Sequence, residues 1–212
     1  MRDANLPIGK FICLKNKQAI LSFAEAEKEL GLPIFVKPAN MGSSVGISKV
    51  ENEADYFKAI EEAFKYDSKI LLEEFIKARE IECAVLGGEA PEASVLGEIK
   101  PKHSFYSYEA KYLDDDGADM TIPAVVDKLV DKQIRELAIK TFVVLNCFGL
   151  GRVDFFLTEN NKIYINEINT LPGFTNISMY PKLWEASGLK QVDLLDKLIQ
   201  FALRRFAKEE KN

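Results

Sequence analysis

The feature that most constrains this chain is the stretch from Gly151 to Gly173, where two apolar runs flank a polar turn. Val, Ile, Phe and Tyr dominate both runs, so the pattern predicts a β-hairpin. Side chains alternate along a strand, so Glu167 and Asn169 project to the same side, about 7 Å apart. Asp154 on the first arm can join them across the ladder. Two carboxylates and an amide oxygen form a ligand set that suits Mg²⁺.

Arg152 belongs to the same predicted face, because it lies two residues before Asp154 on the first arm. Taken alone, the hairpin also fits an ordinary pair of strands with a solvated acidic face. The remainder of the chain has to decide between these two interpretations.

Composition excludes several classes of function. The net charge of −5 argues against a nucleic-acid partner recognised through overall positive charge. Three cysteines lie far apart in apolar surroundings and His103 is the only histidine, which excludes a zinc cluster and indicates reduced thiols in a cytoplasmic protein. No signal peptide or apolar run of membrane length is present, so we expect no membrane partner.

A loop of small residues follows Lys37, the cation at the end of a predicted buried strand. Gly42 and Gly46 bound the loop, and Ser43 and Ser44 lie between them. Such a loop can approach an anion closely and offer backbone N–H groups and hydroxyls to it. It is not a Walker loop, because the lysine precedes the glycines. A plain hairpin turn is the alternative.

Two further segments fit a nucleotide site. An apolar strand ends in Glu73 and Glu74 and can present backbone groups to a purine, while Glu80 can accept from ribose hydroxyls. Each glutamate alone also fits a solvated surface position. Residues 100–121 lack periodicity, and their aromatic residues favour an ordered lid in which Lys111 contacts an anion.

The chain is long enough for one large domain or two small ones. Two amphipathic helices are expected in its second half, over 127–147 and 192–207. The later helix is predicted to bury one apolar stripe: Leu195, Leu198, Ile199, Ala202 and Phe206. The opening residues do not lead into a complete domain, so we expect the chain to begin inside a larger protein.

Five blocks in a fixed order resemble one family: Val36-Lys37-Pro38 with Gly42-Ser43-Ser44-Val45-Gly46, Leu72-Glu73-Glu74-Phe75, Tyr108-Glu109-Ala110-Lys111-Tyr112, Gly151-Arg152-Val153-Asp154, and Asn166-Glu167-Ile168-Asn169-Thr170-Leu171-Pro172-Gly173. The chain is similar to the ATP-grasp ligases and, within them, to the D-alanine:D-alanine ligases of cell-wall synthesis. The resemblance runs from Asn5 to the final helix. It implies the ATP-grasp fold, an α+β fold in which two subdomains with antiparallel sheets, 1–77 and 78–212, hold ATP between them.

The resemblance also implies a role for each matching position. Those implied for the nucleotide are Lys37 and Lys111 for phosphates, Ser43 and Ser44 in a flap, Glu73, Glu74, Phe75 and Ile76 around adenine, Glu80 at the ribose, and Asn166. Those implied for metal and substrates are Asp154, Glu167 and Asn169 for two Mg²⁺ ions, with Mn²⁺ as an alternative, Arg152 and the Gly173 N–H as the oxyanion site, Ser178 and Met179 as the substrate wall, and Tyr112 as the partner of Ser43.

The implied reaction joins two D-alanines for peptidoglycan. ATP phosphorylates the first carboxylate, the second amine attacks the acyl phosphate, and Arg152 steadies the tetrahedral intermediate. The resemblance further implies a homodimer for the full-length protein. Family members begin with an additional α/β domain and a phosphate-binding lysine that these 212 residues lack, so ATP binding without ligation is one alternative. A D-alanine:D-lactate or D-serine ligase is another, although Tyr112 favours the dipeptide-forming type.

Overall fold

The computed structural model describes residues 1–15, 20–42, 44–101, 118–175 and 177–209. The chain divides into two compact units. In the described part of the chain, Gly9–Lys77 forms the small unit, and Met1–Ile8, Ala78–Lys100 and Met120–Asn212 form the large unit. Residues before Gly9 therefore group with the later part of the chain, whereas the sequence analysis assigned them to the first subdomain.

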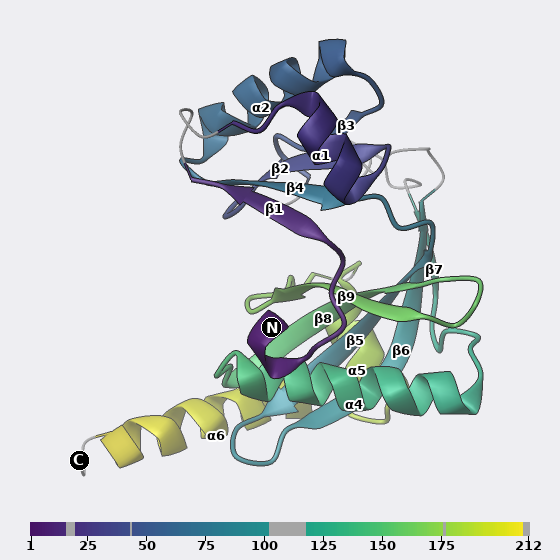
Figure 1. Cartoon of the computed structure of the whole chain (residues 1–212). Coiled ribbons are helices and arrows are strands. Elements are labelled where there is room, and N and C mark those ends of the chain that lie inside the picture. The colour runs from purple at the N-terminus through teal and green to yellow at the C-terminus, as the bar shows by residue number, and fades with distance from the viewer. Residues whose placement is uncertain (16–19, 43, 102–117, 176, 210–212) are drawn as a thin grey trace. The chain divides into compact units, whose positions relative to one another are not determined.

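The small unit contains a four-stranded antiparallel sheet (Figure 1). Its strands, in spatial order, are β1 (Phe11–Leu14), β4 (Ile70–Glu74), β2 (Ile34–Pro38) and β3 (Ser48–Val50). The two strands that bear the predicted nucleotide residues, β2 and β4, are adjacent at the centre of the sheet.

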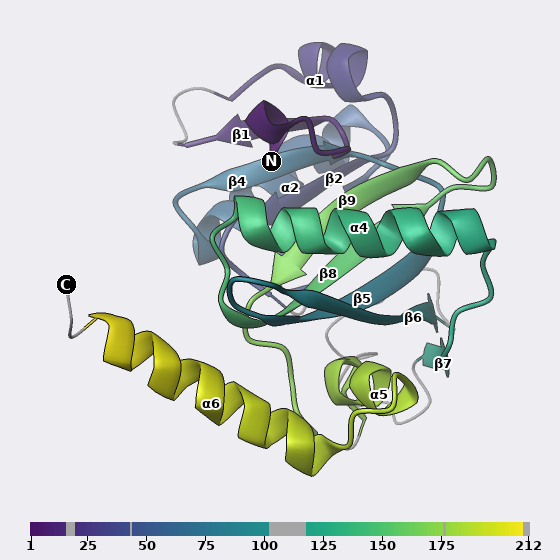
Figure 2. The same ribbon diagram turned by 90° about the horizontal axis from the view of Figure 1, so that it is seen from below.

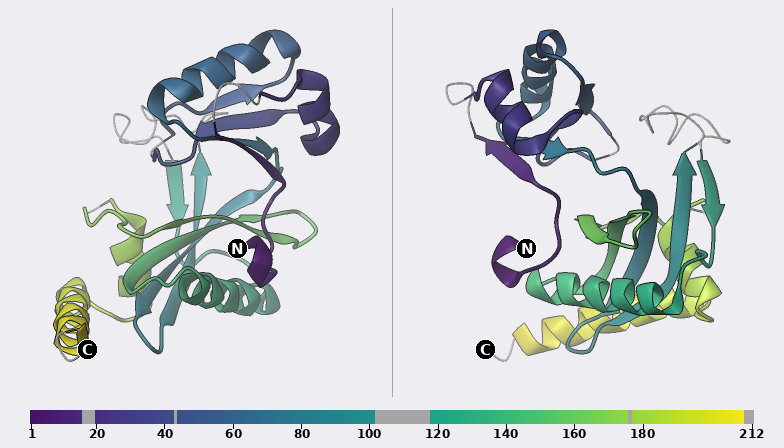
Figure 3. Two further views of the ribbon diagram at one scale, coloured as in Figure 1. Left: turned by 60° about the vertical axis from the view of Figure 1, so that its left-hand side comes forward. Right: turned by 45° about the vertical axis from the view of Figure 1, so that its right-hand side comes forward.

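Helices α1 (Phe23–Leu30) and α2 (Glu53–Tyr66) cover one face of this sheet (Figure 3). Ser22 and Glu25 form a capping box that starts α1, and the Asn52 side chain accepts from the backbone of Asp55 at the start of α2. These local signals are legible in the sequence because each cap satisfies backbone N–H groups that the first helical turn leaves without partners.

Alternation along β2 and β4 separates a buried face from a polar one. Ile34, Val36, Ile70 and Leu72 are fully buried in the core that α1 and α2 cover. The intervening residues, including Lys37 and Glu73, therefore lie on the opposite face. The packing of the helices thus leaves the predicted phosphate-binding lysine outside the small unit's core.

The large unit contains a five-stranded sheet. Its strands, in spatial order, are β7 (Ala118–Thr121), β6 (Glu92–Pro101), β5 (Arg79–Gly87), β8 (Gly149–Leu157) and β9 (Ile163–Asn169). The hairpin predicted from the sequence is β8–β9, and its antiparallel pairing confirms that prediction. Both units combine helices with antiparallel strands, as the α+β prediction requires.

Helices pack on both faces of the large sheet (Figure 2). They are the short η1 (Arg2–Ala4), α4 (Lys128–Val144), α5 (Met179–Ala186) and α6 (Gln191–Glu209). Side chains of α4 join one core cluster, and those of α5 and the start of α6 join a second. In the part of the chain that the structure describes, no helix is both long and apolar enough to cross a bilayer.

The strand β5 supplies both clusters because its side chains alternate. Ile81, Cys83 and Val85 pack in the cluster that contains α4, whereas Ala84 and Leu86 pack with α5. Along β8, Val153 and Phe155 belong to the α4 cluster. The residues between them, Arg152 and Asp154, therefore lie on the α5 face of the sheet.

The inner stripe predicted for the last helix is wrong except at Leu198, which is partly buried. Leu195, Ile199 and Phe206 are 45%, 58% and 61% exposed. The buried residue is Leu194, and Leu198 and Phe201 are partly buried beside it. The sequence of this helix contains two overlapping apolar stripes. Packing against α5 and the sheet buries the stripe that contains Leu194 and Phe201.

Candidate active site

Three carboxylates lie in one row across adjacent strands of the large sheet. Asp154 on β8 is in register with Glu82 on β5 on one side and with Glu167 on β9 on the other. One pair further along, Arg152 is in register with Asn169. Residues opposite each other in an antiparallel pair share a face, with Cβ atoms about 5 Å apart. The predicted metal residues therefore come together with Arg152.

A β-bulge sets the direction of Glu167. Phe155 pairs with Ile165, but the next residue along β8, Asp154, pairs with Glu167, so Asn166 is the extra residue. Ile165 packs in the α4 cluster. Strict alternation would point Glu167 toward the same cluster, and the inserted residue turns it to the face of Asp154 instead.

The guanidinium of Arg152 is held between two carboxylates. Its Nε donates to Asp154 Oδ1 and its Nη2 to Asp154 Oδ2, each at 2.7 Å. The same Nε lies 3.0 Å from Glu82 Oε2. The side chains of Arg152, Asp154 and Glu82 are only 19%, 14% and 7% exposed. Limited access of water strengthens each of these charge interactions.

The pKa of Arg152 reflects this setting. Burial alone would lower it, but the negative charges of Asp154, Glu82 and Glu167 outweigh that effect and raise the pKa further above its ordinary value. Arg152 is therefore a permanent cation. Such a cation suits stabilisation of a developing negative charge and does not suit proton transfer.

The donor chemistry of this row fits Mg²⁺, which prefers carboxylate and amide oxygens. In the structure, however, Asp154 binds Arg152, and Asn169 Oδ1 accepts from the backbone N–H of Leu171 at 3.1 Å. Among the residues that the structure describes, no group of three or more His, Cys, Asp or Glu side chains is arranged to hold a metal ion. Binding of an ion by Asp154 would therefore require Arg152 to give up part of its contact.

The predicted oxyanion and substrate residues follow β9 along the chain. A Cβ on Gly173 would lie 2.7 Å from Ser178 Oγ, so only glycine allows this approach. Ser178 Oγ accepts from the backbone N–H of Thr175 at 3.0 Å, and Ser178 is the N-cap of α5. Met179 is 3% exposed and packs with α5 in the core, so its side chain is a packing element and only its backbone is suited to a substrate wall.

In the small unit, two predicted nucleotide residues are bound to each other. Lys37 Nζ lies 2.8 Å from Glu73 Oε2 on the sheet face that α1 and α2 do not cover. Glu74 Oε1 accepts from the Lys10 backbone N–H at 2.8 Å. Phe75 is 47% exposed and its ring centroid lies 6.0 Å from that of Phe35. A phosphate at Lys37 would therefore compete with Glu73 for the ammonium group.

The glycine loop after β2 has a backbone that needs its small residues. Ser44 and Gly46 both have positive φ, 61° and 71°. A Cβ on Gly46 would lie 2.7 Å from Tyr66 and 2.9 Å from Pro38. The predicted residues Ser43, Lys111 and Tyr112 lie outside the described residues.

Ile76 and Glu80 occupy the segment around the junction of the two units' sequence ranges. Ile76 lies close to Gly9, where an added Cβ would come within 3.1 Å of its Cδ1. Glu80 is on β5, in register with Ile99 of β6 and Phe156 of β8. It therefore shares the α5 face of the sheet with Glu82, two residues further on.

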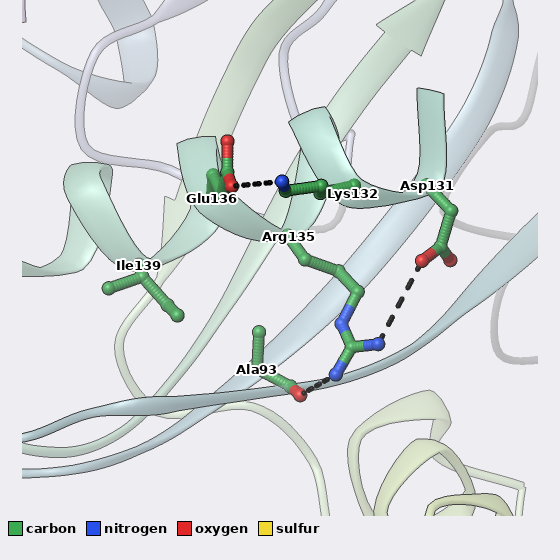
Figure 4. A pocket seen from close by; sticks show the side chains of 6 residues that line it. All are labelled: Ala93, Asp131, Lys132, Arg135, Glu136 and Ile139. Atoms are coloured by element: carbon green, nitrogen blue, oxygen red, sulfur yellow. Dashed lines mark hydrogen bonds and ion pairs between the residues drawn. The ribbon is translucent and has the colours of Figure 1, made fainter. Parts of the chain in front are cut away.

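The hollow of about 240 Å³ shown in Figure 4 lies elsewhere, between α4 and β6. Its charged lining residues already have partners: Arg135 donates to the Ala93 carbonyl and pairs with Asp131, and Lys132 pairs with Glu136. The hollow contains none of the predicted site residues. It offers no converging polar groups for a ligand.

The sequence analysis missed Glu82. The four residues after Glu82 in its strand are apolar, which indicates a buried strand. A carboxylate in such a strand needs a partner, and this was the available signal. Its partner Arg152 lies 70 positions later, and only the β5–β8 register connects the two.

Solved structures are similar to this chain in fold. The chain is 42% identical to the D-alanine–D-alanine ligase of Coxiella burnetii, with a TM-score of 0.87 over 99% of this chain and 56% of that one. It is 36% identical to the VanG D-Ala:D-Ser ligase of Enterococcus faecalis, with a TM-score of 0.83 over 94% and 58%. These neighbours confirm the ATP-grasp fold.

Sequence relatives define the family more narrowly. The model of the D-ala D-ala ligase C-terminus matches residues 1–200. The chain is 56% identical to D-alanine–D-alanine ligase A of Salmonella typhimurium over 97% of its length, and 54% identical to that of Escherichia coli over 98%. It spans 57% of the length of each of these relatives. The chain belongs to the D-alanine–D-alanine ligase family.

Proposed function

We propose that this chain is the ATP- and metal-binding part of a cytoplasmic enzyme that joins two D-alanines into D-alanyl-D-alanine for peptidoglycan. The observation that carries the proposal is the face formed by Arg152, Asp154, Glu167 and Asn169, found in a chain 56% identical to a D-alanine–D-alanine ligase. The relatives extend well beyond the matched region, so D-alanine contacts from their remaining part belong to the same proposal.

In the proposed reaction, a carboxylate oxygen of the first D-alanine attacks the γ-phosphorus of ATP, and ADP leaves. The amine of the second D-alanine then attacks the acyl carbon and loses a proton, and the C–O bond to phosphate breaks. Arg152, a permanent cation, and the Gly173 N–H would stabilise the oxyanion formed between these two events. Bound Mg²⁺, or Mn²⁺ in its place, would neutralise phosphate charge, with Asp154, Glu167 and Asn169 as ligands and two ions expected.

The nucleotide residues have matching chemistry. Lys37 would exchange its contact with Glu73 for a phosphate, and Glu73 would then turn to the adenine edge with Glu74, Phe75 and Ile76. The remaining roles proposed are Glu80 at the ribose, Asn166 beside the metal ligands, Ser43 and Ser44 in the flap, Lys111 at the γ-phosphate, Tyr112 as the partner of Ser43, and Ser178 with Met179 as the substrate wall. A homodimer is proposed for the full-length protein.

D-alanine is the preferred second substrate because the chain is 54–56% identical to enzymes named for it and 36% identical to the D-Ala:D-Ser ligase. Product analysis with D-alanine, D-serine and D-lactate offered together would decide this choice. Depsipeptide or D-alanyl-D-serine as the main product at neutral pH would replace D-alanine in the proposal.

Replacement of Glu167 tests the proposed site. Glu167→Gln keeps the side-chain shape but removes a charged metal ligand, so we expect Mg²⁺-dependent ATP binding to weaken by about tenfold or more. D-alanine-dependent phosphate release by the full-length protein should be abolished. Calorimetric titration of ATP with and without Mg²⁺ measures the first effect, and a phosphate assay the second.

The matched control is Glu159→Gln, which makes the same change in the exposed turn of the same hairpin. It should leave ATP binding within about twofold of the original chain. Equal ATP affinity in the Glu167→Gln variant and the original chain would refute the metal assignment. No ATP binding by the original chain would refute the proposed function for these residues.

A further inference from the structure

Glu82 is a buried carboxylate that the proposed reaction leaves without a role. It lies on β5 in register with Asp154, and its side chain is 7% exposed. Burial of a charge costs free energy unless an opposite charge pairs with it. The partner of Glu82 therefore indicates the role of this residue.

The partner of Glu82 is Arg152, through one particular nitrogen. Arg152 Nε lies 3.0 Å from Glu82 Oε2, while its hydrogen bond goes to Asp154 Oδ1 at 2.7 Å. Glu82 is thus close enough to accept from the Arg152 Nε–H, which donates to Asp154 in this structure. The carboxylates of Glu82 and Asp154, on neighbouring strands, therefore compete for the N–H groups of one guanidinium.

A divalent cation would change the outcome of this competition. An ion on Asp154 withdraws electron density from that carboxylate and repels the guanidinium, so the contact of Arg152 with Asp154 weakens. If Arg152 had no second acceptor, its buried charge would either weaken binding of the ion by Asp154 or move out of the site. Glu82 provides the second acceptor at a distance that needs little movement.

We propose that Glu82 is a positioning residue: it retains the Arg152 guanidinium in the site when Asp154 turns to a divalent cation. The inference rests on the proposed function, because it presumes that Asp154 binds such an ion. It assigns Glu82 no contact with substrate. Glu82 acts only through Arg152 and thereby lets one arginine remain beside the metal ligands.

The first test is a Mg²⁺ titration of the 212-residue chain in the presence of the non-hydrolysable analogue AMP-PNP. Glu82→Gln removes the second carboxylate in contact with Arg152, so we expect the Kd for Mg²⁺ to rise about tenfold, the effect of losing one charge-assisted contact. In an Arg152→Gln background the same substitution should change the Kd by less than about twofold, because the residue through which Glu82 acts is gone.

Two further variants separate position from charge. Glu82→Asp keeps the charge but withdraws the carboxylate by about 1.5 Å, and it should restore Mg²⁺ affinity only in part. Glu98→Gln neutralises another buried, arginine-paired glutamate of the same sheet and should leave the Kd within about twofold. Full restoration by Glu82→Asp would overturn the inference in favour of a simple charge effect.

A spectroscopic measurement follows Arg152 itself. In ¹⁵N-edited spectra, assigned with Arg152→Gln, the Nε–H signal should persist on Mg²⁺ loading of the original chain and be lost by exchange in Glu82→Gln. Equal Mg²⁺ affinity and equal Nε–H signals in both chains would overturn the inference while leaving the proposed function intact. Equal weakening by Glu82→Gln with and without Arg152 would also overturn it. Failure of the original chain to bind Mg²⁺ would overturn both proposals.

Discussion

Two arginines of the large unit, Arg152 and Arg79, each bind a carboxylate through Nε and Nη2, but their surroundings differ. Arg152 is 19% exposed and lies between the carboxylates of two strands. Arg79 is 40% exposed, and its Nε and Nη2 each donate to Glu98 at 2.8 Å. Glu98 is 2% exposed, so Arg79 neutralises a buried charge on the α4 face. Its role is structural.

Arg79→Met should destabilise the large unit in a pH-dependent way. The hydrogen bond from Arg79 lowers the pKa of Glu98, so this pair contributes stability above the unfolded-state pKa, about 4.3, and loses it as pH falls through the lower folded-state pKa. At pH 7 we expect a loss of about 2 kcal/mol, less than for a fully buried pair because Arg79 is partly exposed and Lys100 remains 3.7 Å away. The loss should shrink as pH falls from the unfolded-state value through the lower folded-state pKa, where protonation neutralises Glu98.

Urea unfolding followed by fluorescence of Trp184, the only tryptophan, measures this in the large unit. Arg135→Met is the control, because Arg135 pairs at 3.8 Å with a partly exposed Asp131 and, among the described residues, otherwise donates only to the Ala93 carbonyl, so no buried carboxylate there loses its partner. It should cost no more than about 1 kcal/mol at either pH. A pH-independent loss in Arg79→Met would show that packing of the arginine stem, and not its charge, supports Glu98.

At the level of elements, a glycine sets the distance between α5 and the sheet. A Cβ on Gly97 would lie 2.7 Å from Met179 Sδ and 3.0 Å from Leu183 Cδ2. The first turn of α5 can therefore pack directly on β6. Because Ser178 and Met179 begin that helix, the same contact fixes the proposed substrate wall.

Gly97→Ala should cost about 1–2 kcal/mol in the large unit, because the added methyl group forces the two side chains of α5 outward. The double variant Gly97→Ala with Met179→Ala removes the closest obstacle and should recover part of the loss. Thermal unfolding monitored by Trp184 fluorescence provides the comparison. A Gly97→Ala variant as stable as the original chain would mean that α5 adjusts without cost.

The last helix shows how elements can have the right pattern and the wrong orientation. Its predicted stripe and its buried stripe both recur at helical spacing, so periodicity identifies the helix but not the side that faces the sheet. Leu194 enters the core because α5 ends a few residues before it and fixes the start of α6. The side of α6 that faces the sheet therefore depends on tertiary packing and not on the sequence of α6 alone.

At the scale of the whole molecule, the large unit is discontinuous in sequence. The carbonyl of Pro7 accepts from the Ile165 backbone N–H at 2.7 Å, and Ile8 forms a parallel bridge with Ile165. Leu6 is 5% exposed in the core that contains α4 and the β8–β9 strands. The first eight residues therefore stabilise a unit whose other residues begin at Ala78.

Leu6→Ala should destabilise the large unit by about 2–3 kcal/mol, because it removes a buried side chain and leaves a cavity in the core. The small unit should be unaffected, since Leu6 is not part of its core. Hydrogen exchange read by mass spectrometry resolves the two: faster exchange in β5, β8 and β9, and unchanged exchange in β2 and β4. Equal acceleration in both units would mean that they unfold together.

The sequence by itself determined the elements and the chemistry that depend on neighbours along the chain. Ser22 and Asn52 cap α1 and α2 through contacts with residues three positions further on, alternation located β8 and β9, and the order of five motifs identified the family. These features are local because a helix cap or a strand's alternation involves residues only a few positions apart.

Only the tertiary structure decided which side chains meet. The bulge at Asn166 turns Glu167 toward Asp154, and the β5–β8 register brings Glu82 to Arg152. It also groups the first eight residues with the large unit and selects the buried side of α6. Each of these depends on strand register or on packing between distant segments, and the balance of such non-local contacts leaves no periodic signal in a single sequence.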